Sequence, residues 1–135
     1  MASGGGDVVR VLLDHWERGE FAPRLDHLHP DVEVVNHISG RGFEGRGGVR
    51  RLIGDFDKAF EDWSLTVDEL LTCPDGGRLA VGRVLLHGRK TGSELDRPVA
   101  LLFGLDDGLI VRIELFVNRV DEAYAAAGLE REPPA

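Results

Sequence analysis

Two charged residues on predicted strands, Arg83 and Glu114, are the clearest candidates for acid–base chemistry. Alternate residues of a strand share a face, so Glu114 shares one with Arg112, Phe116 and Asn118. A carboxyl group in apolar surroundings has its charged form disfavoured, which moves its pKa toward neutrality, where proton transfer is efficient. An ion pair with Arg83 would instead keep Glu114 an anion. Both arrangements remain open, as does a plain cross-strand ion pair on a solvent-facing side of the sheet.

Histidines offer a second chemistry, because an imidazole changes charge near neutral pH and can act as a general base. His37 directly follows Asn36, so only one of these two side chains can face a pocket on a given side of the sheet. His87, near a predicted hairpin end, is typical of a solvated edge residue. His27 and His29 with His37 suggest a metal site, but no carboxylate with ligand spacing completes it. We therefore expect no metal and no cofactor.

A glycine-rich stretch over residues 40–45 has the spacing G-x-G-x-x-G of dinucleotide-binding loops. Such loops follow a buried parallel strand and open a helix that holds the pyrophosphate. Here the preceding strand carries Asn36 and His37, and hairpins rather than alternating strands and helices follow. We interpret these glycines as shaping a loop, in which Arg41 and Arg46 are either solvated or available to an anionic group.

The elements that position these residues follow from hydrophobic periodicity. Helical spacing predicts a helix from Asp7 to about Gly19, a short helix over 21–28, a long helix over 49–60 and a last helix from about 119, capped by Asn118, to Gly128. Alternating patterns between turn-rich segments predict strands over 31–38, 64–73, 78–90, 95–105 and 109–118, with a loop over 41–48. This order predicts an α+β fold, with helices packed on one side of a curved antiparallel sheet.

The composition indicates a single domain over residues 1–135, with a core of about 7–129 and flexible ends over 1–6 and 130–135. The net charge of -8 and the absence of a basic run exclude nucleic acid and an acidic membrane surface as partners. A single cysteine, Cys73, suits a reducing compartment and is interpreted as a small structural residue. No stretch is typical of a signal peptide or a membrane span, so we expect a cytoplasmic protein.

Two longer stretches resemble a known family. One, over residues 28–56, reads LHPDVEVVNHISGRGFEGRGGVRRLIGDF, and the other, over 106–129, reads DDGLIVRIELFVNRVDEAYAAAGL. Their order and spacing are similar to those of SnoaL-like polyketide cyclases in the nuclear transport factor 2-like superfamily. The resemblance covers about residues 7–129. It implies a cone-shaped, cystatin-like α+β fold, in which a curved, mixed, mostly antiparallel sheet wraps around three to four helices and encloses an apolar pocket.

The resemblance also implies roles for single residues. Relative to epoxide hydrolases of this superfamily, Arg83 matches an arginine that holds two acids, Asn36 matches an asparagine of the first strand, and Glu114 falls near the last-strand acid. Leu85 replaces the second acid and Val34 a tyrosine, so that site is incomplete. The ketosteroid isomerases have their base where Asn36 stands, and polyketide cyclases need one late acid, for which Glu114 is the nearest candidate. The implied site has Asn36 orienting the substrate, Glu114 moving the proton and Arg83 setting its charge.

A hydrophobic wall completes the expected pocket. The residues expected to contact the substrate are Trp16, Phe56, Phe60, Trp63, Leu85, His87, Phe103 and Phe116. We expect a small hydrophobic ligand, with cyclisation, isomerisation or dehydration by proton transfer as the enzymatic form of the function. The alternative is a non-catalytic ligand-binding or dimeric interaction module. Because both faces of the strands are partly apolar, we expect a homodimer formed through the sheet.

Overall fold

A curved sheet between helices organises the computed structural model, which describes residues 8–20, 28–37, 40–88 and 94–130, without the side chains of Arg41, Phe56, Ala59 and Glu61. The helices of these ranges are α1 (Val8–Glu17), α2 (Arg46–Ala59) and α3 (Val120–Ala127). The strands are β1 (Leu28–Asn36), β2 (Arg41–Glu44), β3 (Phe60–Thr72), β4 (Arg78–Gly88), β5 (Glu94–Asp106) and β6 (Leu109–Val117).

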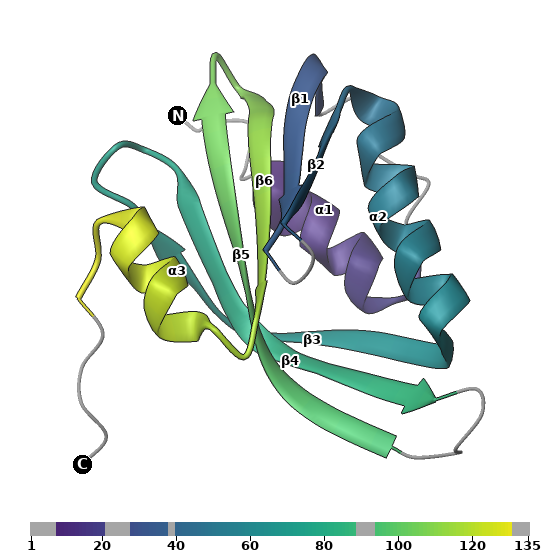
Figure 1. The fold of residues 1–135 in the computed structure, drawn as a ribbon. Coiled ribbons are helices and arrows are strands. Elements are labelled where there is room, and N and C mark those ends of the chain that lie inside the picture. The colour runs from purple at the N-terminus through teal and green to yellow at the C-terminus, as the bar shows by residue number, and fades with distance from the viewer. Residues whose placement is uncertain (1–7, 21–27, 38–39, 89–93, 131–135) are drawn as a thin grey trace.

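The strands form one six-stranded sheet in the order β2-β1-β6-β5-β4-β3. Neighbouring strands are antiparallel except β1 and β6, which run parallel and join the first and the last strand of the chain in the middle of the sheet. Figure 1 shows the curved sheet with α1 and α2 on its concave side and α3 on the other. The predicted α+β class, with a mixed and mostly antiparallel sheet, is confirmed.

The main core lies between the concave side of the sheet and the two longer helices. Helix α1 buries Val9, Leu12, Leu13 and Trp16, which recur at the spacing of one helix face. Helix α2 adds Val49 and Leu52, and the strands supply the remaining buried side chains of this cluster. The two predicted long helices are therefore present because each needs this face to bury its apolar stripe.

Helix α3 covers part of the opposite, outer face of the sheet. Its residues Ala123 and Ala127 pack with Leu79, Ala100 and Phe116 in a second buried cluster. Part of this face is apolar because the last helix of the same chain packs on it. Gly128 ends α3 in the left-handed conformation at φ 74°, as predicted.

The predicted cap of α3 was wrong. The residue at the cap position is Arg119, which makes no side-chain capping hydrogen bond. Asn118 lies one position earlier with φ 62°, and its backbone N–H donates to Pro98 O. Asparagine tolerates this left-handed conformation better than most residues, so it serves the turn out of β6 rather than the helix end.

The glycine-rich segment contains a strand that the sequence analysis missed. Residues Arg41–Glu44 form β2, which pairs with β1 from Asn36↔Arg41 to Glu33↔Glu44. Gly40 at φ 75° and Gly45 at φ 82° make the turns at its two ends, a conformation that glycine adopts without strain. The predicted loop over 41–48 is therefore a hairpin strand followed by the start of α2.

Three further expectations concern residues that lie, almost entirely, outside the part of the chain that the structure describes. The predicted short helix over 21–28 and the predicted flexible ends over 1–6 and 130–135 lie outside the described ranges, apart from Leu28, which begins β1, and Glu130. Among the described helices, none is long and apolar enough to cross a membrane.

Candidate functional site

A cavity of about 50 Å³ lies between α1, α2 and the concave side of the sheet. Ten apolar residues surround it: Trp16, Val49, Leu52, Ile53, Trp63, Leu65, Val84, Val99, Leu101 and Leu115. A cavity needs a volume of about 10–15 Å³ to hold one water molecule. This cavity therefore has room for about four groups of that size. The described wall suits a small apolar group.

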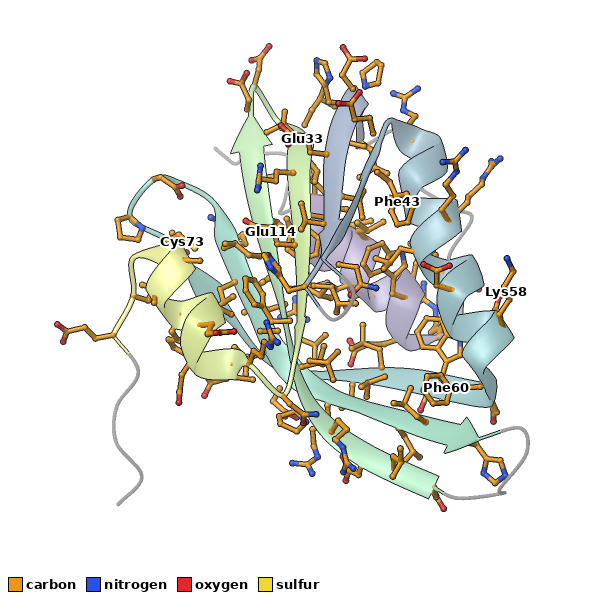
Figure 2. All side chains as sticks on the ribbon, viewed as in Figure 1. Glu33, Phe43, Lys58, Phe60, Cys73 and Glu114 are labelled. Atoms are coloured by element: carbon orange, nitrogen blue, oxygen red, sulfur yellow. The ribbon has the colours of Figure 1, made fainter. Side chains whose placement is uncertain are left out.

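Two of the predicted contact residues, Trp16 and Trp63, stand in this wall. Phe103 is completely buried behind it and packs against Trp16, with ring centroids 6.3 Å apart at a tilt of 44°. Phe60 packs partly buried against the same core and is labelled below α2 in Figure 2. The side chain of Phe56 lies outside the described part of the structure.

The other predicted contact residues lie on the outer face of the sheet. Strand β4 directs Ala80, Val84 and Leu86 into the main core, so the intervening Arg83, Leu85 and His87 point away from the cavity. Leu85 is 41% exposed. Leu85 and His87 border a second, shallow depression with Asp62, Trp63, Ser64 and Glu94, so Trp63 is the one residue shared with the cavity wall. Phe116 belongs to the cluster under α3.

The expected pair of Arg83 and Glu114 does not form. Arg83 donates from Nε to Oδ1 of Asp96 at 2.8 Å, and both side chains are about half exposed. On β6, Ile113 and Leu115 belong to the core on the cavity side, so Glu114 between them points to the outer face. Arg83 and Glu114 therefore lie outside the expected pocket: the alternation along each strand was predicted correctly, but the face that carries these two residues is the outer one.

Glu114 is held by two other residues. Its Oε1 lies 2.9 Å from His37 Nε2, and its Oε2 accepts from Arg112 Nε at 3.1 Å. Burial alone would raise the pKa of this carboxyl, but the hydrogen bonds from His37 and Arg112 outweigh it and lower the pKa below its ordinary value. Glu114 is therefore an anion with both oxygens engaged, opposite to the acid–base role.

The pairing of His37 with Glu114 was not predicted. The His37 ring also stacks on Phe116, with centroids 4.3 Å apart at 14°, and its backbone N–H donates to Leu115 O. The parallel pairing of β1 with β6 sets Val35 beside Glu114 and brings the following His37 within reach. The sequences of the two strands do not specify their parallel register, because it joins segments far apart in the chain. The local residue pattern therefore did not predict the contact between His37 and Glu114.

Asn36 is the one predicted catalytic residue on the cavity side. It shares a face of β1 with Val32 and Val34, which belong to the main core, and it is paired in register with Leu115 of the cavity wall. Asn36 is 6% exposed and is the single buried polar residue among those described. The structure therefore separates the three predicted catalytic residues, with Asn36 inside and Arg83 and Glu114 outside.

Ile53 and Trp63 are the two lining residues of the cavity that are only partly buried, so this part of the wall lies nearest to solvent. There the Trp63 indole Nε1–H donates to Oδ1 of Asp57, on α2, at 2.9 Å. The carboxylate of Asp57 is thereby fixed at the edge of an aromatic ring of the cavity wall. Sequence analysis did not single out Asp57, because a charged residue on the exposed side of the last turn of a helix is typical of a solvated residue.

Among the described residues, no group of three histidine, cysteine, aspartate or glutamate side chains is placed to hold a metal ion. His29, for example, accepts the backbone N–H of Asp31 at 3.0 Å. Cys73 is buried in the cluster under α3, and burial raises the pKa of its thiol. Its position beside α3 is seen in Figure 2 and fits a structural residue.

Solved structures with the same fold define the class of protein. A nuclear transport factor 2-like protein from Burkholderia thailandensis E264 is 21% identical, with a TM-score of 0.74 over 88% of this chain and 94% of that one. A SnoaL-like polyketide cyclase from Jannaschia sp. CCS1, assigned as putative, is 18% identical, with a TM-score of 0.68 over 95% and 94%. A protein with a ketosteroid isomerase-like fold from Catenulispora acidiphila DSM 44928, solved with trimethylamine, is 16% identical, with a TM-score of 0.68 over 94% and 98%. The fold is nuclear transport factor 2-like.

The family follows from the sequence itself. The model of the SnoaL-like domain matches residues 9–113, from α1 into β6. The chain belongs to the SnoaL-like domain family. None of the curated proteins compared with the chain matches it.

Proposed function

We propose that this SnoaL-like protein binds a small hydrophobic molecule in the cavity between α1, α2 and the sheet. The observation that carries the proposal is the wall itself, because all ten residues around the cavity are apolar. Ligand pockets are lined mostly by apolar side chains, and the wall of this cavity shares that feature. Asn36, predicted to orient the substrate, is buried on the same side of the sheet but is not one of the ten residues that line the cavity.

Binding without proton transfer is the form of this function that the geometry favours. Glu114, the expected acid, lies on the outer face with both oxygens engaged. Arg83 is on that face too and is paired with Asp96. Among the structural relatives, one is assigned as a polyketide cyclase and one has a ketosteroid isomerase-like fold, but a shared fold does not carry an activity over to this chain.

Tryptophan fluorescence tests the proposal directly, because the chain has two tryptophans and both stand in the cavity wall. A panel of small hydrophobic ketones, lactones, epoxides and aromatic compounds is titrated while emission and thermal stability are recorded. A ligand at 100 times its Kd adds about 2.7 kcal/mol to the free energy of unfolding, which raises Tm by several degrees in a domain of this size.

Two neighbouring residues of β4 supply matched variants. Val84→Phe fills the cavity, whereas Leu85→Phe places the same ring on the outer face. We expect Val84→Phe to abolish binding and Leu85→Phe to leave it unchanged. If Val84→Phe does not fold, Val99→Leu, which adds one methylene to the cavity wall from the neighbouring strand β5, replaces it. Ligand binding that survives both filling variants, or a panel without any binder, would contradict the proposed function.

A further inference from the structure

The cavity wall contains aromatic rings as well as aliphatic side chains. Trp16 and Trp63 both line it, and they belong to α1 and β3. The face of an indole ring carries negative potential and attracts cations more strongly than the rings of phenylalanine or tyrosine. A positively charged group that enters this cavity therefore meets favourable electrostatics from its wall.

A carboxylate lies beside Trp63, one of the two partly buried residues of the cavity wall. Asp57 accepts the Trp63 indole N–H at 2.9 Å, which fixes the anion beside the ring. Glu17, next to Trp16 in the sequence, accepts the Val67 backbone N–H at 3.0 Å and so also lies against β3. The neighbouring cation Lys58 projects from the outer side of α2 in Figure 2. With a net charge of -8, the chain attracts cations and repels anionic ligands.

The described cavity wall has no hydrogen-bond acceptors on its side chains, and this determines which kind of cation the cavity can bind. A primary ammonium brings three N–H donors, and burying them against apolar side chains leaves them unsatisfied at high cost. A fully alkylated ammonium has no such donors, and its methyl groups contact apolar walls directly. The cavity volume of about 50 Å³ limits the buried part of such a ligand to a small alkylated ammonium group.

We propose that the ligand class of this cavity is a small molecule with a trimethylammonium group, held between Trp16 and Trp63 with Asp57 as its counter-charge. The proposal rests on the proposed binding function and specifies its ligand. The methyl groups fill the apolar interior, while the remainder of the molecule extends past Trp63 to solvent. Asp57 acts by charge at the cavity entrance rather than by proton transfer.

Three probe ligands of similar shape separate charge from size. Choline carries a trimethylammonium group, 3,3-dimethylbutan-1-ol replaces its nitrogen by carbon, and ethanolamine replaces it by a primary ammonium. Isothermal titration and tryptophan emission give the Kd of each. We expect choline to bind at least tenfold more tightly than 3,3-dimethylbutan-1-ol, a difference of 1.4 kcal/mol, and ethanolamine not to bind.

Variants assign the charge effect to its residues. Asp57→Asn keeps an oxygen for the Trp63 N–H but removes the charge, so choline affinity should fall about fivefold while that of 3,3-dimethylbutan-1-ol stays the same. Asp62→Asn changes the net charge equally at an exposed residue of β3 and should leave both affinities unchanged. Trp63→Leu should weaken choline more than its neutral analogue, with Trp16 as the remaining fluorophore.

The outcomes separate this inference from the proposed function. If the neutral analogue binds as tightly as choline, the cavity still binds hydrophobic molecules but the ammonium class is wrong. If Asp62→Asn weakens choline as much as Asp57→Asn does, net charge rather than a site explains the effect, and the inference fails. If no probe and no member of the hydrophobic panel binds, both proposals fail.

Discussion

At the scale of single residues, the carboxylate of Glu114 is a stabilising group rather than a reactive one. Hydrogen bonds from His37 and Arg112 hold its pKa below the ordinary value of 4.5, despite its partial burial. The native state therefore releases this proton more easily than the unfolded chain does. The resulting stabilisation is present above the pKa of the unfolded chain and is lost as pH falls through the lower pKa of the folded state.

We expect Glu114→Gln to lower the free energy of unfolding by about 2 kcal/mol at pH 7, because it removes hydrogen bonds to a charged group. The corresponding fall in Tm is roughly 6–10 °C. Chemical unfolding between pH 3 and pH 7 gives the comparison, and the difference from wild type should shrink below about pH 4.5. Glu69→Gln, at an exposed position of β3, serves as the control. A pH-independent difference would contradict the assigned cause.

The same residues show what sequence patterns predict at this scale. Alternation along β6 correctly grouped Glu114 with Arg112 and Phe116. It did not indicate which of the two faces looks into the cavity, because both faces carry apolar residues and one is covered by α3. Asn36 and His37 were correctly separated, since neighbours on a strand point to opposite sides. Assigning the faces required the pairing of β1 with β6.

At the scale of elements, the pairing of β3 with β4 depends on one close approach between their backbones. The pairing of β3 with β4 shifts register between Val67 and Glu69, where β3 has an extra residue. Opposite this bulge stands Gly82, where an added Cβ would lie 1.9 Å from the Thr66 carbonyl oxygen. A bulge bends its strand and increases the local twist, so β3 can curve around α1 only while position 82 has no side chain.

We therefore expect Gly82→Ala to destabilise the fold by at least about 2–3 kcal/mol, since a backbone atom cannot be displaced as a flexible side chain can. Gly54→Ala provides the matched comparison, because a Cβ there meets nothing within 4 Å in the middle of α2. That variant should gain about 0.5–1 kcal/mol from helix propensity. Urea unfolding of both variants measures these changes. Equal effects of the two substitutions would show that the contact with Thr66 does not constrain the sheet.

Element boundaries were predicted where a side-chain period marks them and missed where pairing alone defines them. The stripes of α1 and α2 and the turn residues between the strands identified most of the fold. Strand β2 has four residues, too few for a clear alternation, and it is held by its pairing with β1 and by the turns at Gly40 and Gly45. A short edge strand of this kind can be assigned only from its pairing with the neighbouring strand, which the sequence pattern does not show.

At the scale of the whole molecule, α3 limits where a second copy can bind. The helix already covers the apolar part of the outer face around Phe116, so an interface through the sheet must use the uncovered part around Leu85. Nearby, Arg83 and Asp96 offer opposite charges that two copies related by a twofold axis can exchange. We propose that the chain forms a homodimer through this surface of β4 and β5.

The two exposed leucines of the β4–β5 hairpin test the dimer. Leu85, 41% exposed, lies on the outer face, whereas Leu95, 36% exposed, is paired with Leu86 of the main core and faces the other side. Light scattering after gel filtration should give twice the 14.8 kDa chain mass for the wild type and for Leu95→Glu, and a monomer for Leu85→Glu. A charge buried at the interface costs several kcal/mol, enough to shift the equilibrium at micromolar concentration. A monomeric wild type, or dissociation of both variants alike, would rule out this surface.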